Sequence, residues 1–180
     1  ARSEFAREVG GDYYDYHQLS DEEYAVIIAD VAGKGVPASF NMAQMKGIFQ
    51  ALVRLDLSPS EFLVKANDAL GSCLEKAAFI TATFFRINTK LKKVCYSRAG
   101  HCPAFFFNKN KNTVHMMHSG GLGLGIVRAE KFAAFVEEHE FTYQPGDLLM
   151  AYTDGLVEAR QDIEGEEYGY DRLQGALYQY

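Results

Sequence analysis

The sequence predicts a protein of the α+β class, with largely antiparallel strands and two helices inserted between them. Three observations support this class. Apolar segments of strand length occur in neighbouring pairs along the chain. Two adjacent segments after the first pair instead repeat their apolar residues at helical spacing. The later strands are joined by short polar turns, which is typical of antiparallel neighbours.

The first two strands are expected to form a hairpin. Residues 9–16 read as a strand that Gly10 and Gly11 interrupt. Residues 24–30 (Tyr-Ala-Val-Ile-Ile-Ala-Asp) read as a buried strand. The polar turn 20–23 separates the two, so the chain reverses there.

Two helices are expected next. Residues 37–55 carry apolar residues at helical spacing, and Ser58-Pro59-Ser60-Glu61 is a capping box with proline at the first helical position. Each helix therefore has a predicted buried stripe. The stripes are Phe40, Ala43, Gly47 or Ile48, Ala51 or Leu52 and Leu55 in the first helix, and Phe62, Leu63, Ala66, Leu70 and Leu74 in the second.

Strands dominate the remainder of the chain. Residues 79–87 are apolar on both alternating sets apart from Thr81 and Thr83, so we expect both faces to be covered. Residues 93–98 should pair with this strand. The other expected elements are strands 103–107 and 113–117 around the turn 108–112, strands 131–142 and 147–152 around the turn 144–146, and a helix at 171–178.

The composition is that of a globular protein and limits the partners. The 180 residues are 48% hydrophobic, and we expect one domain, 1–180. A net charge of −6 argues against a non-specific binder of nucleic acid or anionic membranes. Three cysteines without CxxC spacing favour a reducing, cytoplasmic location. No apolar run approaches the ~20 residues that span a bilayer, although a longer parent protein could carry a membrane anchor.

Three aspartates stand where apolar strands end. Asp12, Asp30 and Asp154 each adjoin a glycine or a glycine-rich turn. Burial of such a carboxylate is costly unless something binds it. Three of them brought together by the fold would form an oxygen-rich site that suits Mg²⁺ or Mn²⁺. Asp12 and Asp15 face opposite sides of a strand, and Asp12 is the better candidate because it adjoins Gly11.

Each segment taken alone also has an ordinary structural explanation. Asp12 could be a solvated residue of a β-bulge, and Asp30 could cap the helix that follows. The glycines of residues 33–35 lack the spacing of a phosphate loop, and those of residues 121–125 predict a tight loop because no helix follows. His101 could be a ligand or a proton donor, but a histidine beside glycine and proline is more often structural.

Taken together, these segments resemble the PPM-type metal-dependent serine/threonine phosphatases. The likeness is greatest to the bacterial branch of the stage II sporulation protein E and sigma-regulator phosphatases. The segments occur in the order of the family and cover nearly the whole chain. They are residues 8–15 (Glu-Val-Gly-Gly-Asp-Tyr-Tyr-Asp), 30–38 (Asp-Val-Ala-Gly-Lys-Gly-Val-Pro-Ala), 99–103 (Ala-Gly-His-Cys-Pro), 121–125 and 146–155.

The resemblance implies an αββα sandwich of two mainly antiparallel sheets flanked by helices. It also implies that Asp12, Asp30 and Asp154 bind two Mn²⁺ or Mg²⁺ ions, that Asp30 bridges them and that Val31 contributes its backbone carbonyl. The implied activity is hydrolysis of protein phosphoserine or phosphothreonine by metal-activated water. In this branch the substrate is commonly an anti-sigma-factor antagonist, and a sensor or receiver domain commonly precedes the catalytic domain.

The chain departs from the family pattern at three places. The last metal-binding Asp of the family and the strand that normally precedes Glu8 are absent, so we expect a domain trimmed at both ends. Ala32 stands where relatives often have a histidine proton donor. Arg7 lies near the position of a phosphate-binding arginine in some relatives.

Two other functions compete with the phosphatase as interpretations of this sequence. The alternative is a non-catalytic phosphoprotein-binding or regulatory module with a degraded metal site. A diguanylate cyclase is disfavoured, because Tyr13 follows Asp12 where that family has an acidic residue. Dimerisation through the helices of residues 37–75 is a further expectation.

Overall fold

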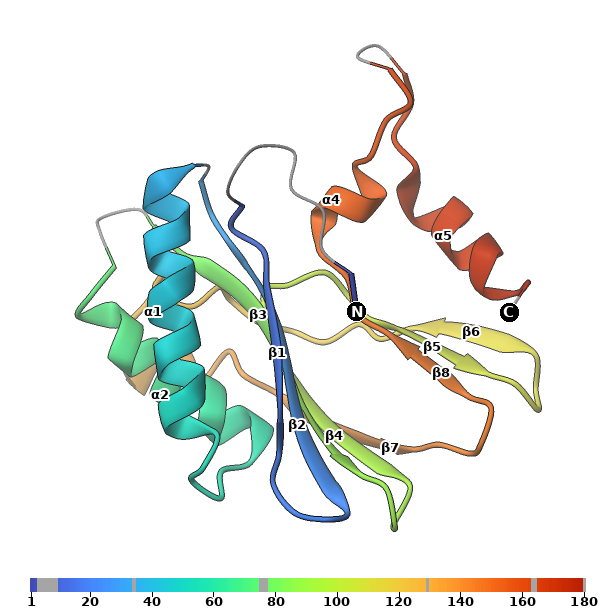
Figure 1. Ribbon diagram of the computed structural model, residues 1–180, viewed down its shortest axis with the longest axis horizontal. Coiled ribbons are helices and arrows are strands. Elements are labelled where there is room, and N and C mark those ends of the chain that lie inside the picture. Colours follow the sequence, from blue (N-terminus) through green and yellow to red (C-terminus); the bar gives the residue numbers. More distant parts are fainter. Residues whose placement is uncertain (3–9, 34, 75–77, 129, 163–164, 180) are drawn as a thin grey trace. The chain divides into compact units, whose positions relative to one another are not determined.

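The computed structural model describes residues 1–2, 10–33, 35–74, 78–128, 130–162 and 165–179. Helices and antiparallel strands both occur, which confirms the α+β class (Figure 1). In chain order the elements are β1 (Tyr13–Gln18), β2 (Glu23–Val31), α1 (Val36–Leu52), α2 (Pro59–Gly71), β3 (Ile80–Asn88), β4 (Lys93–Ala99), β5 (Phe105–Asn108), β6 (Thr113–Met116), α3 (Glu130–Ala133), β7 (Glu138–Thr142), β8 (Leu148–Met150), α4 (Asp154–Val157) and α5 (Gly169–Leu177).

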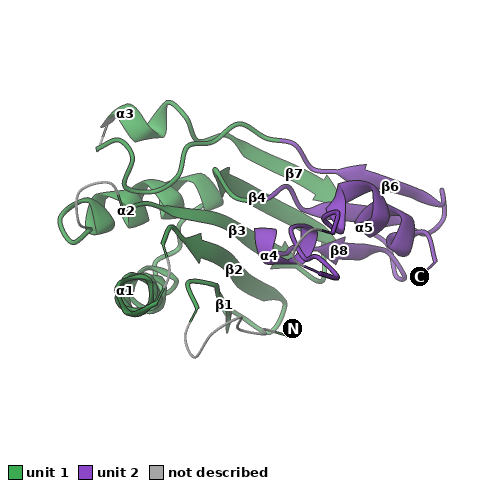
Figure 2. Cartoon of the chain, turned by 90° about the horizontal axis from the view of Figure 1, so that it is seen from above, with its two compact units in different colours: residues 1–101, 119–142 green, residues 102–118, 143–180 purple. Residues whose placement is uncertain are grey.

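The chain divides into two compact units (Figure 2). Unit 1 comprises residues 1–101 and 119–142, and unit 2 comprises residues 102–118 and 143–180. Unit 1 contains a five-stranded sheet in the order β1-β2-β3-β4-β7, and unit 2 contains a three-stranded sheet in the order β6-β5-β8. All the strand pairs are antiparallel, as the sequence predicts. The assignment of residues 1–180 to one domain stays a prediction.

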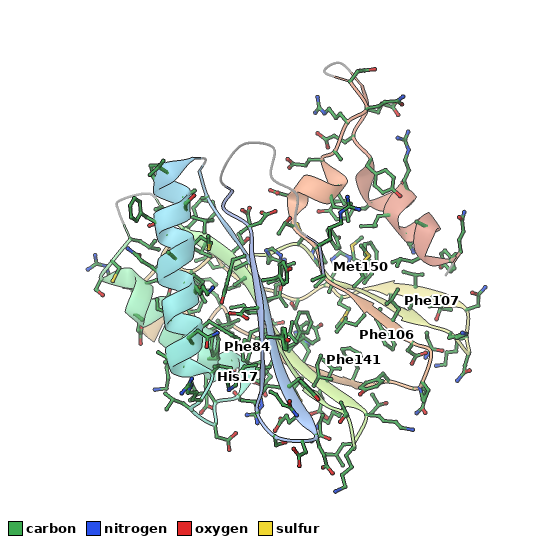
Figure 3. All side chains as sticks on the ribbon, in the orientation of Figure 1. His17, Phe84, Phe106, Phe107, Phe141 and Met150 are labelled. Carbon is green, nitrogen blue, oxygen red and sulfur yellow. The ribbon has the colours of Figure 1, made fainter. Side chains whose placement is uncertain are left out.

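Helices α1 and α2 cover one face of the five-stranded sheet in unit 1 (Figure 2). Alternate residues of β2, from Ala25 to Val31, are buried against them. The rings of Phe62 and Phe84 stack in this core with centroids 3.9 Å apart, and Figure 3 labels Phe84. The capping box at Ser58 and Glu61 forms as predicted and begins α2. Four of the five residues in the predicted stripe, Phe62, Leu63, Ala66 and Leu70, are fully buried in α2, whereas Leu74 lies beyond the end of the helix and is only partly buried.

The predicted buried stripe of α1 is partly wrong. Phe40 and Leu55 are 67% and 50% exposed, whereas Ala38, Met45 and Phe49 are the buried residues of the helix. Apolar residues occur on more than one side of α1, so periodicity alone does not select the core face. Contact with α2 and with the sheet selects it, since Phe49 packs edge to face against Phe62 of α2 and Phe84 of β3.

The predicted strand 131–142 is also corrected by the structure. Its first part is the short helix α3, and only Glu138–Thr142 forms the strand β7. β7 pairs with β4 in unit 1, whereas β8 pairs with β5 in unit 2, so the two strands around residues 144–146 do not form a hairpin. The carboxylate of Asp147 explains the pairing of β8, because it accepts the amides of Gln144 at 2.8 Å and Lys109 at 2.9 Å and so ties the start of β8 to the β5–β6 turn.

Unit 2 has a hydrophobic core of its own. The hairpin of β5 and β6 forms as predicted, and α5 closely matches the predicted helix 171–178. Leu173 and Leu177 of α5 pack in a cluster with Phe105 and Tyr152. Across the described parts of both units, no helix has the length and apolar character that a membrane crossing requires.

Candidate metal site

Asp12 and Asp30 are brought together by the first hairpin. Tyr13 pairs with Ala29 in the ladder of β1 and β2, so the next position pairs Asp12 with Asp30. The pairing continues beyond this position, because the amide of Val31 donates to the carbonyl of Gly11 at 3.3 Å. No residue is inserted between these two pairs, which argues against a β-bulge at Asp12. Directly opposite residues project from the same face of a sheet, so Asp12 and Asp30 share a face.

This face is the one that the helices leave uncovered. Side chains alternate along β2, and Ala29 and Val31 are buried under the helices while Asp30 between them is only partly buried. Asp15 lies on the helix-covered face, where its Oδ2 accepts hydrogen bonds from the Tyr13 hydroxyl and from Nε2 of Gln50, both at 2.9 Å. The prediction that Asp15 turns away from Asp12 is confirmed.

The Tyr13 hydroxyl stays protonated beside Asp15. Burial raises the pKa of Tyr13 far above its ordinary value, and the hydrogen bond and charge of Asp15 raise the pKa further. The neutral hydroxyl is therefore the donor in the hydrogen bond to Asp15.

Gly11 lies in close contact with the neighbouring strand β2. A Cβ at this position would lie 2.8 Å from the carbonyl oxygen of Val31 and 3.4 Å from Oδ1 of Asp30. Any side chain would therefore collide with the Val31 carbonyl and displace the strand that carries Asp30. The glycine is required for this contact between strands, and the predicted close approach of the backbone to a ligand stays a prediction.

These donors fit a hard divalent cation. Carboxylate and carbonyl oxygens suit Mg²⁺ and Mn²⁺ better than the nitrogen and sulfur ligands that zinc favours. Asp30 is also not the cap of the following helix, because the N-cap residue of α1 is Gly35. The structural alternatives that the sequence left open for Asp12 and Asp30 are thus less favoured than a ligand role.

The third predicted ligand lies in unit 2. Asp154 is exposed at the first position of α4, directly after the N-cap residue Thr153. The pKa of Tyr170 is raised by burial, then by Cys102 and by the charge of Asp154, so Asp154 lies near Tyr170. Within the described ranges, no three His, Cys, Asp or Glu side chains are grouped closely enough to hold a metal. The convergence of Asp154 with Asp12 and Asp30 stays a prediction.

Thr81 is a further polar residue beside Asp30, and its sequence pattern predicted no role for it. Thr81 is the direct partner of Asp30 on β3, and its hydroxyl lies 2.9 Å from Nδ1 of His101. His101 is only 2% exposed. The signal in the sequence was a threonine in an otherwise apolar strand, at the end where the neighbouring strand carries Asp30.

The glycine-containing segment 121–125 forms a loop against the start of β3. Ile80 and Leu124 exchange two backbone hydrogen bonds of 3.0 and 2.7 Å. The buried side chain of Asn67 in α2 accepts the amide of Gly125 at 2.9 Å and donates to the carbonyl of Val127 at 3.1 Å. The prediction of a tight loop is confirmed. The loop supports the strand that carries Thr81.

Arg7, Glu8 and Lys34 lie outside the described residues.

Comparison with known families gives one match over most of the chain. The family described as stage II sporulation protein E (SpoIIE) matches residues 20–180. Among curated proteins, the chain is similar to phosphoserine phosphatase RsbU of Bacillus subtilis (strain 168), with 31% identity over 87% of this chain and 45% of that protein. It is also similar to phosphoserine phosphatase RsbP of the same organism, with 26% identity over 84% of this chain and 37% of that protein. The chain thus spans less than half the length of these two relatives.

Two solved structures illustrate the similarity of fold. The SiaA-PP2C domain of Pseudomonas aeruginosa has a TM-score of 0.78 and 20% identity, over 94% of this chain and 65% of that chain. RsbX in complex with magnesium has a TM-score of 0.68 and 19% identity, over 97% of this chain and 82% of that chain. At these identities the likeness concerns the fold alone.

Proposed function

Because the chain belongs to the SpoIIE family, we propose that it is a metal-dependent phosphatase that hydrolyses phosphoserine or phosphothreonine in a protein substrate. The observation that carries the proposal is the placement of Asp12 opposite Asp30, between the Tyr13–Ala29 pair and the hydrogen bond from Val31 to Gly11. The family membership and the similarity to two phosphoserine phosphatases support it.

In this proposal, the carboxylates of Asp12, Asp30 and Asp154 and the carbonyl of Val31 would hold two Mn²⁺ or Mg²⁺ ions. The oxygen donors near Gly11 support the assignment, as does the magnesium complex of the structurally similar RsbX. When bound, the ions would activate water as the nucleophile and screen the negative charge of the phosphate.

The residues of this chain supply position and charge for the proposed reaction. Asp12 and Asp30 concentrate two carboxylates on one sheet face, and Gly11 keeps the space beside them free of a side chain. Ala32 has no ionisable group, so the residue at this position supplies no proton to the departing serine oxygen. Positioned electrostatic groups account for the larger part of catalysis in such reactions.

The proposed substrate is a phosphoprotein, and an anti-sigma-factor antagonist is the first candidate by similarity to RsbU and RsbP. A sensor or receiver domain is the proposed upstream partner. A cytoplasmic location is part of the proposal, in accord with three cysteines that lack CxxC spacing. Nucleic acid is not a proposed partner, in accord with the net charge of −6. A homodimer through the helices of residues 37–75 stays a prediction.

One observation favours the alternative, a non-catalytic module that binds phosphoproteins. Asp12 and Asp30 are only two carboxylates, and the part of the chain that the structure describes has no cluster of three potential ligands. Two carboxylates bind a divalent ion more weakly than three. Because hydrolysis in the proposed mechanism requires the ions, a domain without them would bind a phosphoprotein and leave it intact.

Turnover of a phosphoserine peptide tests the proposal. We expect phosphate release with Mn²⁺ or Mg²⁺, its complete loss in excess chelator and its recovery when Mn²⁺ is added back. Asp30→Asn is the matched inactive variant, because it keeps the size of the side chain and removes its charge.

Two results would contradict the proposal in different ways. Equal turnover in excess chelator would indicate a covalent nucleophile instead of bound ions. Binding of the phosphopeptide without release of phosphate, in the presence of Mn²⁺, would favour the non-catalytic module.

A further inference from the structure

The peptide group between Asp30 and Val31 is held from both sides. Its amide, the N–H of Val31, donates to the carbonyl of Gly11 at 3.3 Å. Its carbonyl, that of Asp30, lies 3.4 Å from the hydroxyl of Thr81 on the neighbouring strand. A peptide group is planar, so contacts on both sides fix its orientation. The two residues that this peptide group joins carry the oxygen donors near Gly11, the Asp30 carboxylate and the Val31 carbonyl.

The hydroxyl of Thr81 has a second partner. It lies 2.9 Å from Nδ1 of His101, whose side chain is 2% exposed. A hydroxyl has one proton and can donate only once. Both contacts are satisfied together when the hydroxyl donates to the Asp30 carbonyl and accepts from Nδ1–H. The arrangement therefore requires the histidine tautomer with its proton on Nδ1.

The main chain around His101 is anchored independently of any ligand. The guanidinium of Arg98 donates to the carbonyls of His101 and Ser119, and its Nε donates to the Ser119 hydroxyl at 3.2 Å. Gly100 has a φ of 69°, and a Cβ there would lie 2.9 Å from the amide nitrogen of Gly123. Gly100 also bridges to Ala82, next to Thr81. The backbone that carries the imidazole is thus fixed at this position.

We propose that Thr81 and His101 are positioning residues that orient the Asp30–Val31 peptide group for metal binding. The inference rests on the proposed function, since that function places Asp30 and Val31 at the metal. Neither residue touches the substrate in this proposal. Their effect is on the affinity for the ion, because partners that orient a metal ligand typically change metal affinity about 10- to 100-fold when they are removed.

Calorimetric titration with Mn²⁺ tests the role of the Thr81 hydroxyl without an activity assay. Thr81→Val removes the hydroxyl with little change of shape and should weaken Mn²⁺ binding about 10- to 100-fold. Thr81→Ser keeps the hydroxyl and should bind Mn²⁺ within about threefold of wild type. Thr83→Val is the matched control, because Thr83 lies on the same face of β3, is 2% exposed and has no hydrogen-bond partner for its hydroxyl among the described residues. This control should bind Mn²⁺ as wild type does.

Substitution of His101 gives a second comparison. His101→Asn keeps an N–H donor near the position of Nδ1, whereas His101→Leu removes it. We expect tighter Mn²⁺ binding by His101→Asn than by His101→Leu. Circular dichroism and thermal melts show whether each variant is folded. Equal affinities for these two folded variants would overturn the role of His101.

The tautomer of His101 supplies a readout that needs no metal. Two-bond ¹H–¹⁵N correlation spectra at pH about 8.5, above the ordinary histidine pKa of ~6.5, distinguish the two neutral forms. We expect the Nδ1–H form for His101. His139 is the internal control, because its Nε2 lies 3.2 Å from a carboxylate oxygen of Glu137, which only accepts, so the Nε2–H form should predominate. An Nε2–H form at His101 would overturn the proposal.

The outcomes separate this inference from the proposed function. If Thr81→Val binds Mn²⁺ like wild type while Asp30→Asn does not, the positioning role is wrong and the metal site stands. If wild type itself does not bind Mn²⁺, the proposed function fails, and the positioning role fails with it even where the Nδ1–H tautomer is observed.

Discussion

Asp30 and Asp15 lie on opposite faces of the same hairpin, so they form a matched pair for substitution. Asp30→Asn should lower phosphatase turnover by about 100-fold or more, because one positioned electrostatic group typically contributes ~10²- to 10³-fold. Asp15→Asn should leave turnover within a few-fold of wild type, since Asp15 binds Tyr13 and Gln50 on the helix-covered face. The measurement is kcat/KM with saturating Mn²⁺. Comparable losses in two folded variants would mean that the assignment of the faces is wrong.

Gly11 and Gly47 differ in the space around them. Gly11→Ala should abolish Mn²⁺ binding and turnover, because its Cβ would lie 2.8 Å from the Val31 carbonyl oxygen. An added methyl at the exposed Gly47 of α1 meets no atom within 4 Å. Gly47→Ala should therefore stabilise the protein by about 0.5–1 kcal/mol, the usual gain in a helix interior, without loss of turnover. Urea denaturation and Mn²⁺ titration of both variants make the comparison. Full Mn²⁺ affinity in Gly11→Ala would exclude a ligand at this position.

At the scale of elements, Glu138 of β7 is bound to the first turn of α2. Its Oε2 accepts the amide of Ser60 at 3.0 Å and the Ser60 hydroxyl at 2.9 Å. Burial acts to raise the pKa of Glu138, but the hydrogen bonds from the Ser60 amide and from the hydroxyls of Ser58 and Ser60 outweigh it, so the pKa is lowered. A lowered carboxyl pKa stabilises the folded protein above the pKa of the unfolded chain, and this stabilisation is lost as the pH falls through the folded pKa.

Substitution of Glu138 should therefore have a pH-dependent cost. Glu138→Gln should reduce the free energy of unfolding at pH 7 by about 0.3–1 kcal/mol, the usual contribution of an anion at a helix N-terminus. The difference from wild type should shrink as the pH falls below about 4.3, the pKa of an unperturbed glutamate. Urea denaturation at pH 7, 5 and 3.5 measures it. A difference that stays constant over this range would show that the charge of Glu138 does not contribute.

At the scale of the whole molecule, metal binding should stabilise the folded chain. An ion that binds only the folded state adds about 2.7 kcal/mol at a free concentration 100 times its Kd. For a chain of this size, ~1 kcal/mol raises the melting temperature by about 2–4 °C, so Mn²⁺ should raise it by roughly 5–10 °C. Asp30→Asn should abolish the increase, and Asp154→Asn should reduce it. Scanning fluorimetry over a Mn²⁺ titration gives the result.

The Asp154 variant also tests whether unit 2 contributes to the metal site. Asp12 and Asp30 belong to unit 1 and Asp154 to unit 2. A full Mn²⁺ effect in Asp154→Asn, with none in Asp30→Asn, would mean that the ion binds unit 1 alone. The three-aspartate prediction would then be wrong, whereas the pairing of Asp12 and Asp30 would stand.

The sequence by itself determined the features that depend on near neighbours. The hairpin of β1 and β2, the capping box at Ser58 and the buried stripe of α2 follow from turn residues and periodicity within a few positions. The opposite orientations of Asp12 and Asp15 follow in the same way from the two-residue period of a strand. These features require no knowledge of the rest of the fold.

Only the tertiary structure decided the features that depend on distant partners. The core face of α1 depends on contact with α2 and with the sheet, because apolar residues occur on more than one side of that helix. β7 joins β4 and β8 joins β5, since strand edges choose partners by packing and not by distance along the chain. Thr81 and His101 are 20 residues apart, and no local sequence pattern predicts their contact. The Thr81 hydroxyl indicates a role at the site only because the sheet places Thr81 opposite Asp30.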